Sequence, residues 1–176
     1  MRVIAGELRS RRVKGVPGVA TRPTPDRLRE TLFDILAPRI ADATFLDAYA
    51  GTGAVGIEAL SRGARHAYFL ERDRTALAVL RENLSALGLE SRSTVVPGRV
   101  LLTLLQYHAE LVFLDPPYDR EREYGEALDM LSQNPPALVV VQHSVRCPLG
   151  ERYGQLRACR RVRQGDNMLS FFEPGD

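Results

Sequence analysis

A glycine-rich segment follows the first apolar stretch of the body of the chain and combines flexible turns with a carboxylate. It covers residues 45–56, carries the spacing GxGxxG from Gly51 onward, and has Asp47 just before the turn. Glycines at this spacing let the backbone approach a ligand closely. Glu71 ends the next apolar stretch twenty residues after Gly51, where an acid can bind both hydroxyls of a ribose. The pattern predicts a ligand that contains a nucleoside.

Asp47 narrows the choice of ligand. An NAD-type fingerprint shares the glycine spacing and the downstream acid. A carboxylate at the end of the strand would repel a pyrophosphate bound at the following helix N-terminus. It suits a cationic ligand such as the methionine ammonium of S-adenosylmethionine. The alternative is a tight turn whose glycines serve packing alone.

A second candidate site is the run Asp115-Pro116-Pro117-Tyr118, directly after the apolar stretch 111–114. The two prolines donate no hydrogen bonds and leave rigid carbonyl acceptors. Asp115 adds a carboxylate acceptor, and Tyr118 offers a flat face for a base. Two acceptors beside an aromatic ring are what the exocyclic amino group of a nucleobase requires. A strand-ending turn without chemistry is the alternative.

Alternating elements must position these two segments. Short apolar stretches predict buried strands at 44–46, 67–70, 94–96, 111–114 and 138–141. Helical patterns lie between them, at 54–62, 73–87, 99–107 and 121–133. This alternation predicts a parallel sheet covered on both faces. Because ligands bind outside the carboxyl ends of such strands, both candidate segments should face one crevice.

The two ends of the chain differ from the alternating body. Residues 2–14 hold two short segments that favour a hairpin, and a helix is expected to follow Pro25. At the other end, residues 156–163 and 168–172 flank a turn with no helix between them. This pattern predicts an antiparallel hairpin that closes the sheet.

Positive charge gathers near the N-terminus. Residues 1–40 carry nine basic and four acidic side chains, whereas residues 41–136 carry nine and fourteen. A basic N-terminal region on an acidic body is typical of an enzyme that binds a polyanion, and a solvated basic face is the alternative. The basic side chains that could contact such a polyanion, for example RNA, are Arg2, Arg9, Arg11, Arg12, Lys14, Arg22 and Arg27.

Composition excludes several classes of protein. With 176 residues, 44% hydrophobic and 26% charged, the chain is typical of one soluble domain rather than a disordered or membrane-spanning protein. Two cysteines without CxxC spacing and three scattered histidines predict neither a disulfide framework nor a metal site. We therefore expect a cytoplasmic protein.

Several stretches resemble known methyltransferases. Residues 115–118 resemble the amino-methyltransferase signature (Asp/Asn/Ser)-Pro-Pro-(Tyr/Phe/Trp), and residues 47–53 resemble motif I of the class I S-adenosylmethionine-dependent enzymes. Residues 2–6, 21–33 and 58–64 are similar to the bacterial RsmD family, which methylates a guanine N2 in 16S ribosomal RNA. The likeness extends from residue 2 to about residue 172.

The resemblance implies an α/β fold with a seven-stranded, mostly parallel Rossmann-like sheet in the order 3-2-1-4-5-7-6, strand 7 being antiparallel. It implies a basic hairpin extension over 1–20, a methyltransferase domain over 21–176, and a monomer that acts on 16S rRNA or the small ribosomal subunit. Asp115 and the Pro116 carbonyl would hold the target amine, with Pro117 and Tyr118 beside them. The residues expected to bind the cofactor are Asp47, Ala48, Gly51, Thr52, Gly53, Glu71, Arg72 and Arg99.

Two positions depart from the family pattern. Arg99 stands where related enzymes often place an acidic or amide residue near the adenine, and Gln142 stands where relatives tend to have an acid. Two other functions share parts of the pattern: a DNA adenine-N6 or cytosine-N4 methyltransferase, and a non-catalytic RNA-binding module. The DNA enzymes usually need a larger target-recognition region than this chain accommodates.

Overall fold

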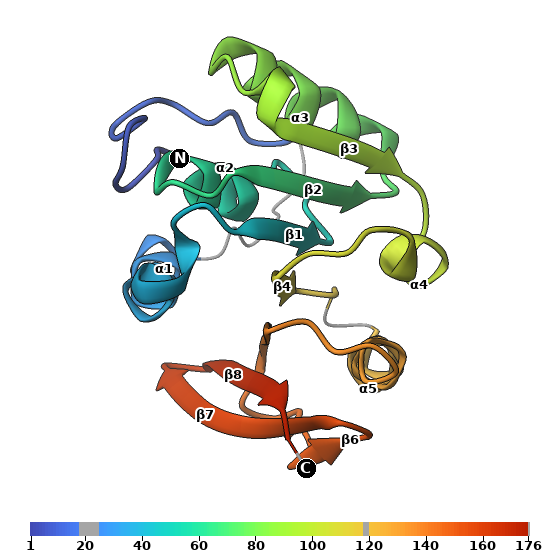
Figure 1. The fold of residues 1–176 in the computed structure, drawn as a ribbon. Helices are drawn as coiled ribbons and strands as arrows, with labels where there is room; N and C mark the ends of the chain where they lie inside the picture. The colour runs from blue at the N-terminus through green and yellow to red at the C-terminus, as the bar shows by residue number, and fades with distance from the viewer. Residues whose placement is uncertain (18–24, 118–119, 176) are drawn as a thin grey trace.

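One mixed sheet organises the chain (Figure 1). The computed structural model describes residues 1–17, 25–117 and 120–175, so Arg22 and Tyr118 lie outside the described residues. The strand order is β3-β2-β1-β4-β5-β8-β7-β6. The strands are β1 (Thr44–Ala48), β2 (His66–Glu71), β3 (Ser93–Pro97), β4 (Leu111–Leu114), β5 (Leu138–Ser144), β6 (Arg152–Tyr153), β7 (Leu156–Gln164) and β8 (Asn167–Pro174).

This order confirms the predicted fold class. Strands β1 to β5 are parallel, and β8 pairs antiparallel with β5. The structure has eight strands instead of seven because the two-residue strand β6 pairs with the start of β7 at the edge of the sheet. Two residues are too few to show any hydrophobic period, so the sequence pattern could not reveal β6.

Helices cover both faces of the parallel strands. They are α1 (Asp26–Ile40), α2 (Ala54–Ser61), α3 (Arg74–Ala86), α4 (Val100–Thr103) and α5 (Glu121–Leu131), with short 3-10 turns at Glu90–Arg92 and Leu104–Gln106. The sequence predicted one helix over 99–107. The structure has α4 over the first part of this range and the 3-10 turn Leu104–Gln106 over the rest. None of the described helices has the length and apolar character needed to cross a membrane.

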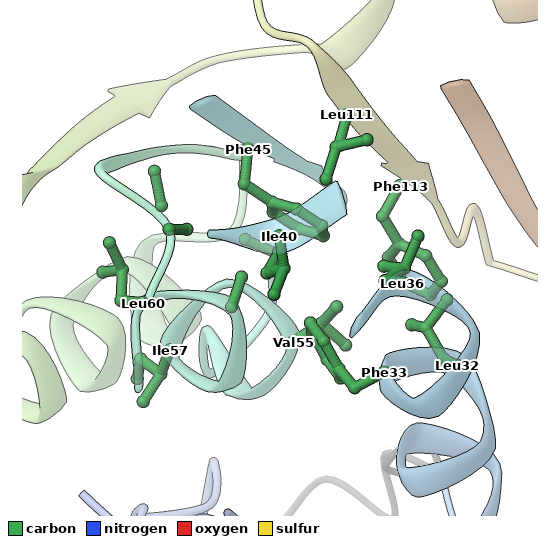
Figure 2. Close-up of a cluster of buried hydrophobic side chains, with 14 of the residues drawn as sticks. Leu32, Phe33, Leu36, Ile40, Phe45, Val55, Ile57, Leu60, Leu111 and Phe113 are labelled. Atoms are coloured by element: carbon green, nitrogen blue, oxygen red, sulfur yellow. The ribbon is translucent and has the colours of Figure 1, made fainter. Parts of the chain in front are cut away.

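Alternation along each strand separates two apolar cores. Phe45 and Phe113 pack under α1 and α2, whereas Leu46 and Leu114 pack under α4 and α5. Figure 2 shows the first core, in which side chains from both helices meet the strands. Since helices bury both faces, the first residues of β4 and β5 are continuous runs of apolar side chains. The labelled helical residues of this core are Leu32, Phe33, Leu36, Ile40, Val55, Ile57 and Leu60.

The N-terminal segment packs against this body. Its predicted hairpin contains one antiparallel bridge, between Arg2 and Arg12. Val3 and Val13 are buried in the core under α1 and α2. The Leu8 amide also donates to the Ser61 hydroxyl at the end of α2, over 3.0 Å. Residues 1–14 therefore contribute to the same core as the helices.

A buried carboxylate holds this segment in place. The side chain of Glu58 is fully buried and accepts hydrogen bonds from the amides of Ile4 (2.8 Å) and Ala5 (3.0 Å) and from Arg62 Nε (2.9 Å). Arg29, also fully buried, donates to the Arg2 carbonyl over 2.6 Å. Charged groups inside a protein are stable only with such partners.

We predict that Glu58→Ala destabilises the fold by about 3–5 kcal/mol, because it leaves buried donors without their acceptor. Urea unfolding measures this loss, and faster tryptic cleavage within residues 1–14 should accompany it. Glu82→Ala is the matched control, since Glu82 is 55% exposed and pairs with Lys14 at the surface. The control should lose at most about 1 kcal/mol. Equal losses in the two variants would contradict the role given to Glu58.

Candidate active site

Parallel pairing brings the ends of three strands together. Ala48 is in register with Leu70 of β2 and with Leu114 of β4. The residues that follow or flank these positions, Asp47, Glu71 and Asp115, therefore lie at one edge of the sheet. Burial raises the pKa of Asp47, and the charges of Asp115 and Glu71 raise it further. The carboxyl ends of these neighbouring strands therefore bring the three carboxyl groups to one edge of the sheet.

Asp47 is a carboxylate in an apolar setting. It is 2% exposed, and its Oδ2 accepts a hydrogen bond from the Gly56 amide over 2.8 Å. Burial raises the pKa of Asp47 well above its ordinary value, although the Gly56 hydrogen bond opposes this. A cation bound beside Asp47 would favour the ionised form. The site therefore suits a positively charged ligand.

The glycines of the turn have two different roles. Gly53 and Gly56 serve packing, because a Cβ would lie 2.4 Å from Leu80 at Gly53 and 2.3 Å from Phe69 at Gly56. At Gly51, which has a φ of 56°, a Cβ would meet no described atom within 4 Å. The turn thus has no space for a side chain where it faces the core. It does have space at Gly51, which leaves that side available to a ligand.

Glu71 orders the turn as well as ending its strand. Its carboxylate accepts hydrogen bonds from the amides of Gly51 (2.7 Å), Arg72 (2.8 Å) and Asp73 (2.8 Å). Arg72 binds Glu71 through its backbone amide, and the Arg72 side chain is exposed. A carboxylate has about four acceptor positions. A ligand hydroxyl can therefore join these three donors.

The other predicted cofactor residues surround the same turn. Ala48 is fully buried in the second core, and the Thr52 carbonyl accepts from Asn83 of α3 over 3.0 Å. Arg99 is exposed and lies beside the end of β3, where the amide of the preceding Gly98 donates to the Glu71 carbonyl over 2.9 Å. A cavity of about 600 Å³ begins there, lined by Arg99, Leu101, Arg120, Glu121, Arg122, Glu123 and Glu126.

Asp115 directly follows β4 and supplies the carboxyl group of the Asp-Pro-Pro run. Loss of hydration raises the pKa of Asp115 to about 7. The carbonyl of the buried Pro116 accepts a weak hydrogen bond from the Tyr124 hydroxyl of α5, at 3.4 Å. Pro117 is exposed. Asp115 and the Pro116 carbonyl are thus two acceptors that directly follow one strand.

The sequence did not reveal a tyrosine contact that joins the glycine-rich turn to α5. Tyr49 has a left-handed backbone (φ 66°), and its hydroxyl donates to Glu123 of α5 over 2.7 Å. Arg120 pairs with the same carboxylate at 3.1 Å. Burial and the Glu123 carboxylate raise the pKa of the Tyr49 hydroxyl. The only local signal was a tyrosine inside a glycine-rich turn, since its partner is 74 residues away.

The tip of the N-terminal hairpin lies away from these strand ends, whereas Lys14 lies near the glycine-rich turn, because Asn83 of α3 donates to the carbonyls of both Lys14 (3.1 Å) and Thr52 (3.0 Å). The Glu7 amide, near the tip of the hairpin, donates to the carbonyl of Ser61, the last residue of α2. In Figure 1 this segment lies opposite the arrowheads of β1, β2 and β3. Arg2, Arg9, Arg11, Arg12, Lys14 and the α1 residue Arg27 are all exposed. Across the described ranges, no group of three or more His, Cys, Asp or Glu side chains could hold a metal ion.

Comparison with known proteins agrees with this architecture. The fold is the Rossmann-like fold of methyltransferases, and it superposes on the Escherichia coli protein yhhF, a candidate methyltransferase, with a TM-score of 0.88. That structure shares 34% identity, and the match covers 99% of this chain and 97% of that chain.

The chain belongs to the RsmD family, because the family described as conserved hypothetical protein 95 matches residues 1–173. It is 38% identical to ribosomal RNA small subunit methyltransferase D of Haemophilus influenzae over 158 residues, covering 85% of this chain and 81% of that protein. It is 40% identical to the E. coli protein of the same name over 136 residues, covering 76% and 68%.

The raised pKa of Asp115 predicts a pH-dependent stability. Between its ordinary value of 3.8 and about 7, the carboxyl holds its proton in the folded chain but loses it on unfolding. Rising pH therefore destabilises the fold across this window. Urea unfolding of wild type and Asp115→Asn should show the wild type losing stability relative to the variant from pH 4 to 7.5. A difference that stays constant with pH would mean that the carboxyl titrates normally.

Proposed function

We propose that this chain transfers a methyl group from S-adenosylmethionine to the exocyclic N2 of a guanine in 16S ribosomal RNA. The observation that carries the proposal is the convergence of the buried Asp47 with Asp115 and the Pro116 carbonyl at neighbouring strand ends. A site for a cationic ligand then adjoins two acceptors for an amine. The names of the RsmD relatives support ribosomal RNA as the substrate.

The residues around the turn fit the proposed cofactor. S-adenosylmethionine, when bound, supplies a methyl group activated by a positively charged sulfur. Asp47 would hold the ammonium of its methionine, because this buried carboxylate lies in surroundings that favour a cation. Gly51 is open to a ligand, and Glu71 would accept from the ribose beside its three amide donors. Arg99 would lie near the adenine, at the mouth of the cavity.

The Asp-Pro-Pro run would orient the amine. A guanine amine is a poor nucleophile, because its lone pair is delocalised into the ring. Hydrogen bonds from its two N–H groups to Asp115 and the Pro116 carbonyl would aim the lone pair at the methyl carbon. This positioning supplies most of the acceleration. The Asp115 carboxylate stabilises positive charge that develops on the nitrogen.

No strong base is needed in this scheme, because the amine becomes acidic as it is methylated. The target base must leave its stack to reach the crevice, which costs a few kcal/mol. Stacking on Tyr118 would offset part of that cost. The basic surface of the N-terminal segment would hold the RNA backbone at a distance from the target.

Labelled methyl transfer tests the proposal. The wild type is incubated with labelled S-adenosylmethionine and with purified ribosomal RNA, small subunits or DNA, and the products are analysed as nucleosides. We expect label in N2-methylguanosine from small-subunit RNA. Asp115→Ala should lower the rate by about 100-fold or more, since a preorganised acceptor is lost. Cofactor affinity, measured by calorimetry, should stay within a few-fold.

The other outcomes are equally informative. Label in adenine or cytosine of DNA would replace the RNA assignment with a DNA amino-methyltransferase. RNA binding without transfer on any substrate would indicate a non-catalytic module. Tight binding of NAD with none of S-adenosylmethionine would overturn the cofactor assignment.

The basic segment provides a separate prediction about RNA binding. Arg9 and Arg12 are exposed, whereas Arg11 donates to the Ala86 carbonyl over 3.1 Å and Lys14 pairs with Glu82. Replacing Arg9 and Arg12 together with alanine should weaken RNA binding, because exposed arginines contact phosphates. Each lost contact should reduce the slope of log affinity against log salt by about 0.7 to 0.9.

The measurement is RNA affinity across a salt series. Arg9→Lys with Arg12→Lys is the matched control, which keeps both charges and should keep the slope. S-adenosylmethionine affinity should be the same in all three proteins. If the alanine variant retains wild-type slope and affinity, the segment is a solvated face and the RNA surface lies elsewhere.

A further inference from the structure

A buried amide near the end of β5 lacks a hydrogen-bond partner. Gln142 is 4% exposed, and its side-chain oxygen Oε1 accepts no hydrogen bond from any group that the structure describes. Leaving a buried acceptor without a donor destabilises a fold, and native proteins rarely do so away from functional sites. The unpaired oxygen therefore points to a missing donor.

The register of the sheet places this amide beside Asp115. Leu114 of β4 pairs with Val141 of β5, so Asp115 and Gln142 are the next positions along two neighbouring strands. Val140 packs in the core under α1 and α2, and alternation puts Gln142 on the same face. Asp115 is expected on this side as well, because Phe113, two residues earlier, packs in the same core.

The groups around Gln142 do not supply the donor. The Pro116 carbonyl is an acceptor, and so is Asp115 once it has lost its proton, which it does above a pH of about 7. On the other side of β5, Gln142 is in register with the apolar Leu169 of β8. Among the described residues no group donates to this oxygen, so it is available to a donor on a substrate whose amine is held by the neighbouring Asp115.

We propose that Gln142 Oε1 accepts a hydrogen bond from N1–H of the target guanine and thereby selects guanine over adenine. This inference rests on the proposed function. The Watson–Crick edge of guanine carries the N1–H and the N2 amine side by side, which matches two acceptors on adjacent strands. Adenine presents its N6 amine beside an acceptor at N1, so it would satisfy Asp115 but leave Gln142 Oε1 facing a lone pair. A site built to accept a hydrogen bond rejects analogues that lack the donor.

Two variants of Gln142 separate recognition from folding. Gln142→Met keeps the length of the side chain and removes the acceptor, whereas Gln142→Glu keeps an acceptor oxygen. We expect kcat/KM for RNA methylation to fall roughly 10- to 100-fold in the methionine variant, because the guanine N1–H is left unpaired. The glutamate variant should recover most of this loss.

Stability and cofactor binding provide readouts that a structural role would not reproduce. Gln142→Met should unfold at the wild-type Tm or above it, since it removes an orphaned polar group. Its S-adenosylmethionine affinity should match the wild type. Gln155→Met is the matched control, because Gln155 is exposed at the opposite end of the sheet, beside the start of β7.

A modified substrate makes the test specific. A short target RNA is prepared with 2-aminopurine, which keeps the 2-amine but has no N1–H, in place of the guanine that the wild type methylates. The wild type should lose activity on this RNA by a factor similar to that of Gln142→Met on guanine. The methionine variant should be insensitive to the change of base.

The controls distinguish failure of the proposed function from failure of the role proposed for Gln142. If the wild type methylates no guanine, the proposed function fails. If it methylates guanine and Gln142→Met does so at the same rate, or if the variant remains as sensitive to 2-aminopurine as the wild type, the role of Gln142 fails while the proposed function stands.

Discussion

Burial of the parallel strands on both faces is the constraint from which the rest of this structure follows. Crossover helices must cover both faces, so side chains in the middle of β1, β4 and β5 are apolar and pack into the two cores. Polar chemistry is then confined to the points where these strands end. Asp47, Glu71, Asp115 and Gln142 all lie at that edge, although the chain separates them by as much as 95 residues, the span from Asp47 to Gln142.

The same confinement explains the electrostatics of the edge. Carboxylates next to an apolar core lose hydration, and the raised pKa values of Asp47 and Asp115 are the result. Neither group is placed there for stability. The left-handed backbone of Tyr49 and the unpaired oxygen of Gln142 belong to the same small region. Strained backbone and unpaired polar groups are typical of sites where a bound ligand compensates their energetic cost.

Sequence patterns predicted whatever depends on short-range order. Each strand end could be located from an apolar stretch followed by a polar residue, so the class of fold and the convergence of Asp47, Glu71 and Asp115 followed from topology. Contacts between distant segments carry no such signal. Neither the Tyr49–Glu123 hydrogen bond nor the capture of the N-terminal amides by Glu58 has a local pattern. The basic residues were recognised by composition, but the attachment of their segment to α2 and α3 required the structure.

The attachment of the N-terminal segment has a consequence for synthesis of the chain. The amides of Ile4 and Lys14 find their acceptors in Glu58 and Asn83, which lie 54 and 69 residues later. These residues leave the ribosome before their partners and must therefore wait, at about 5–20 residues per second, for several seconds until α2 and α3 have been made. During that interval the segment remains a charged, solvated strand, and its two valines enter the core only after both helices have formed. The beginning of the chain is thus among the last parts of this core to settle.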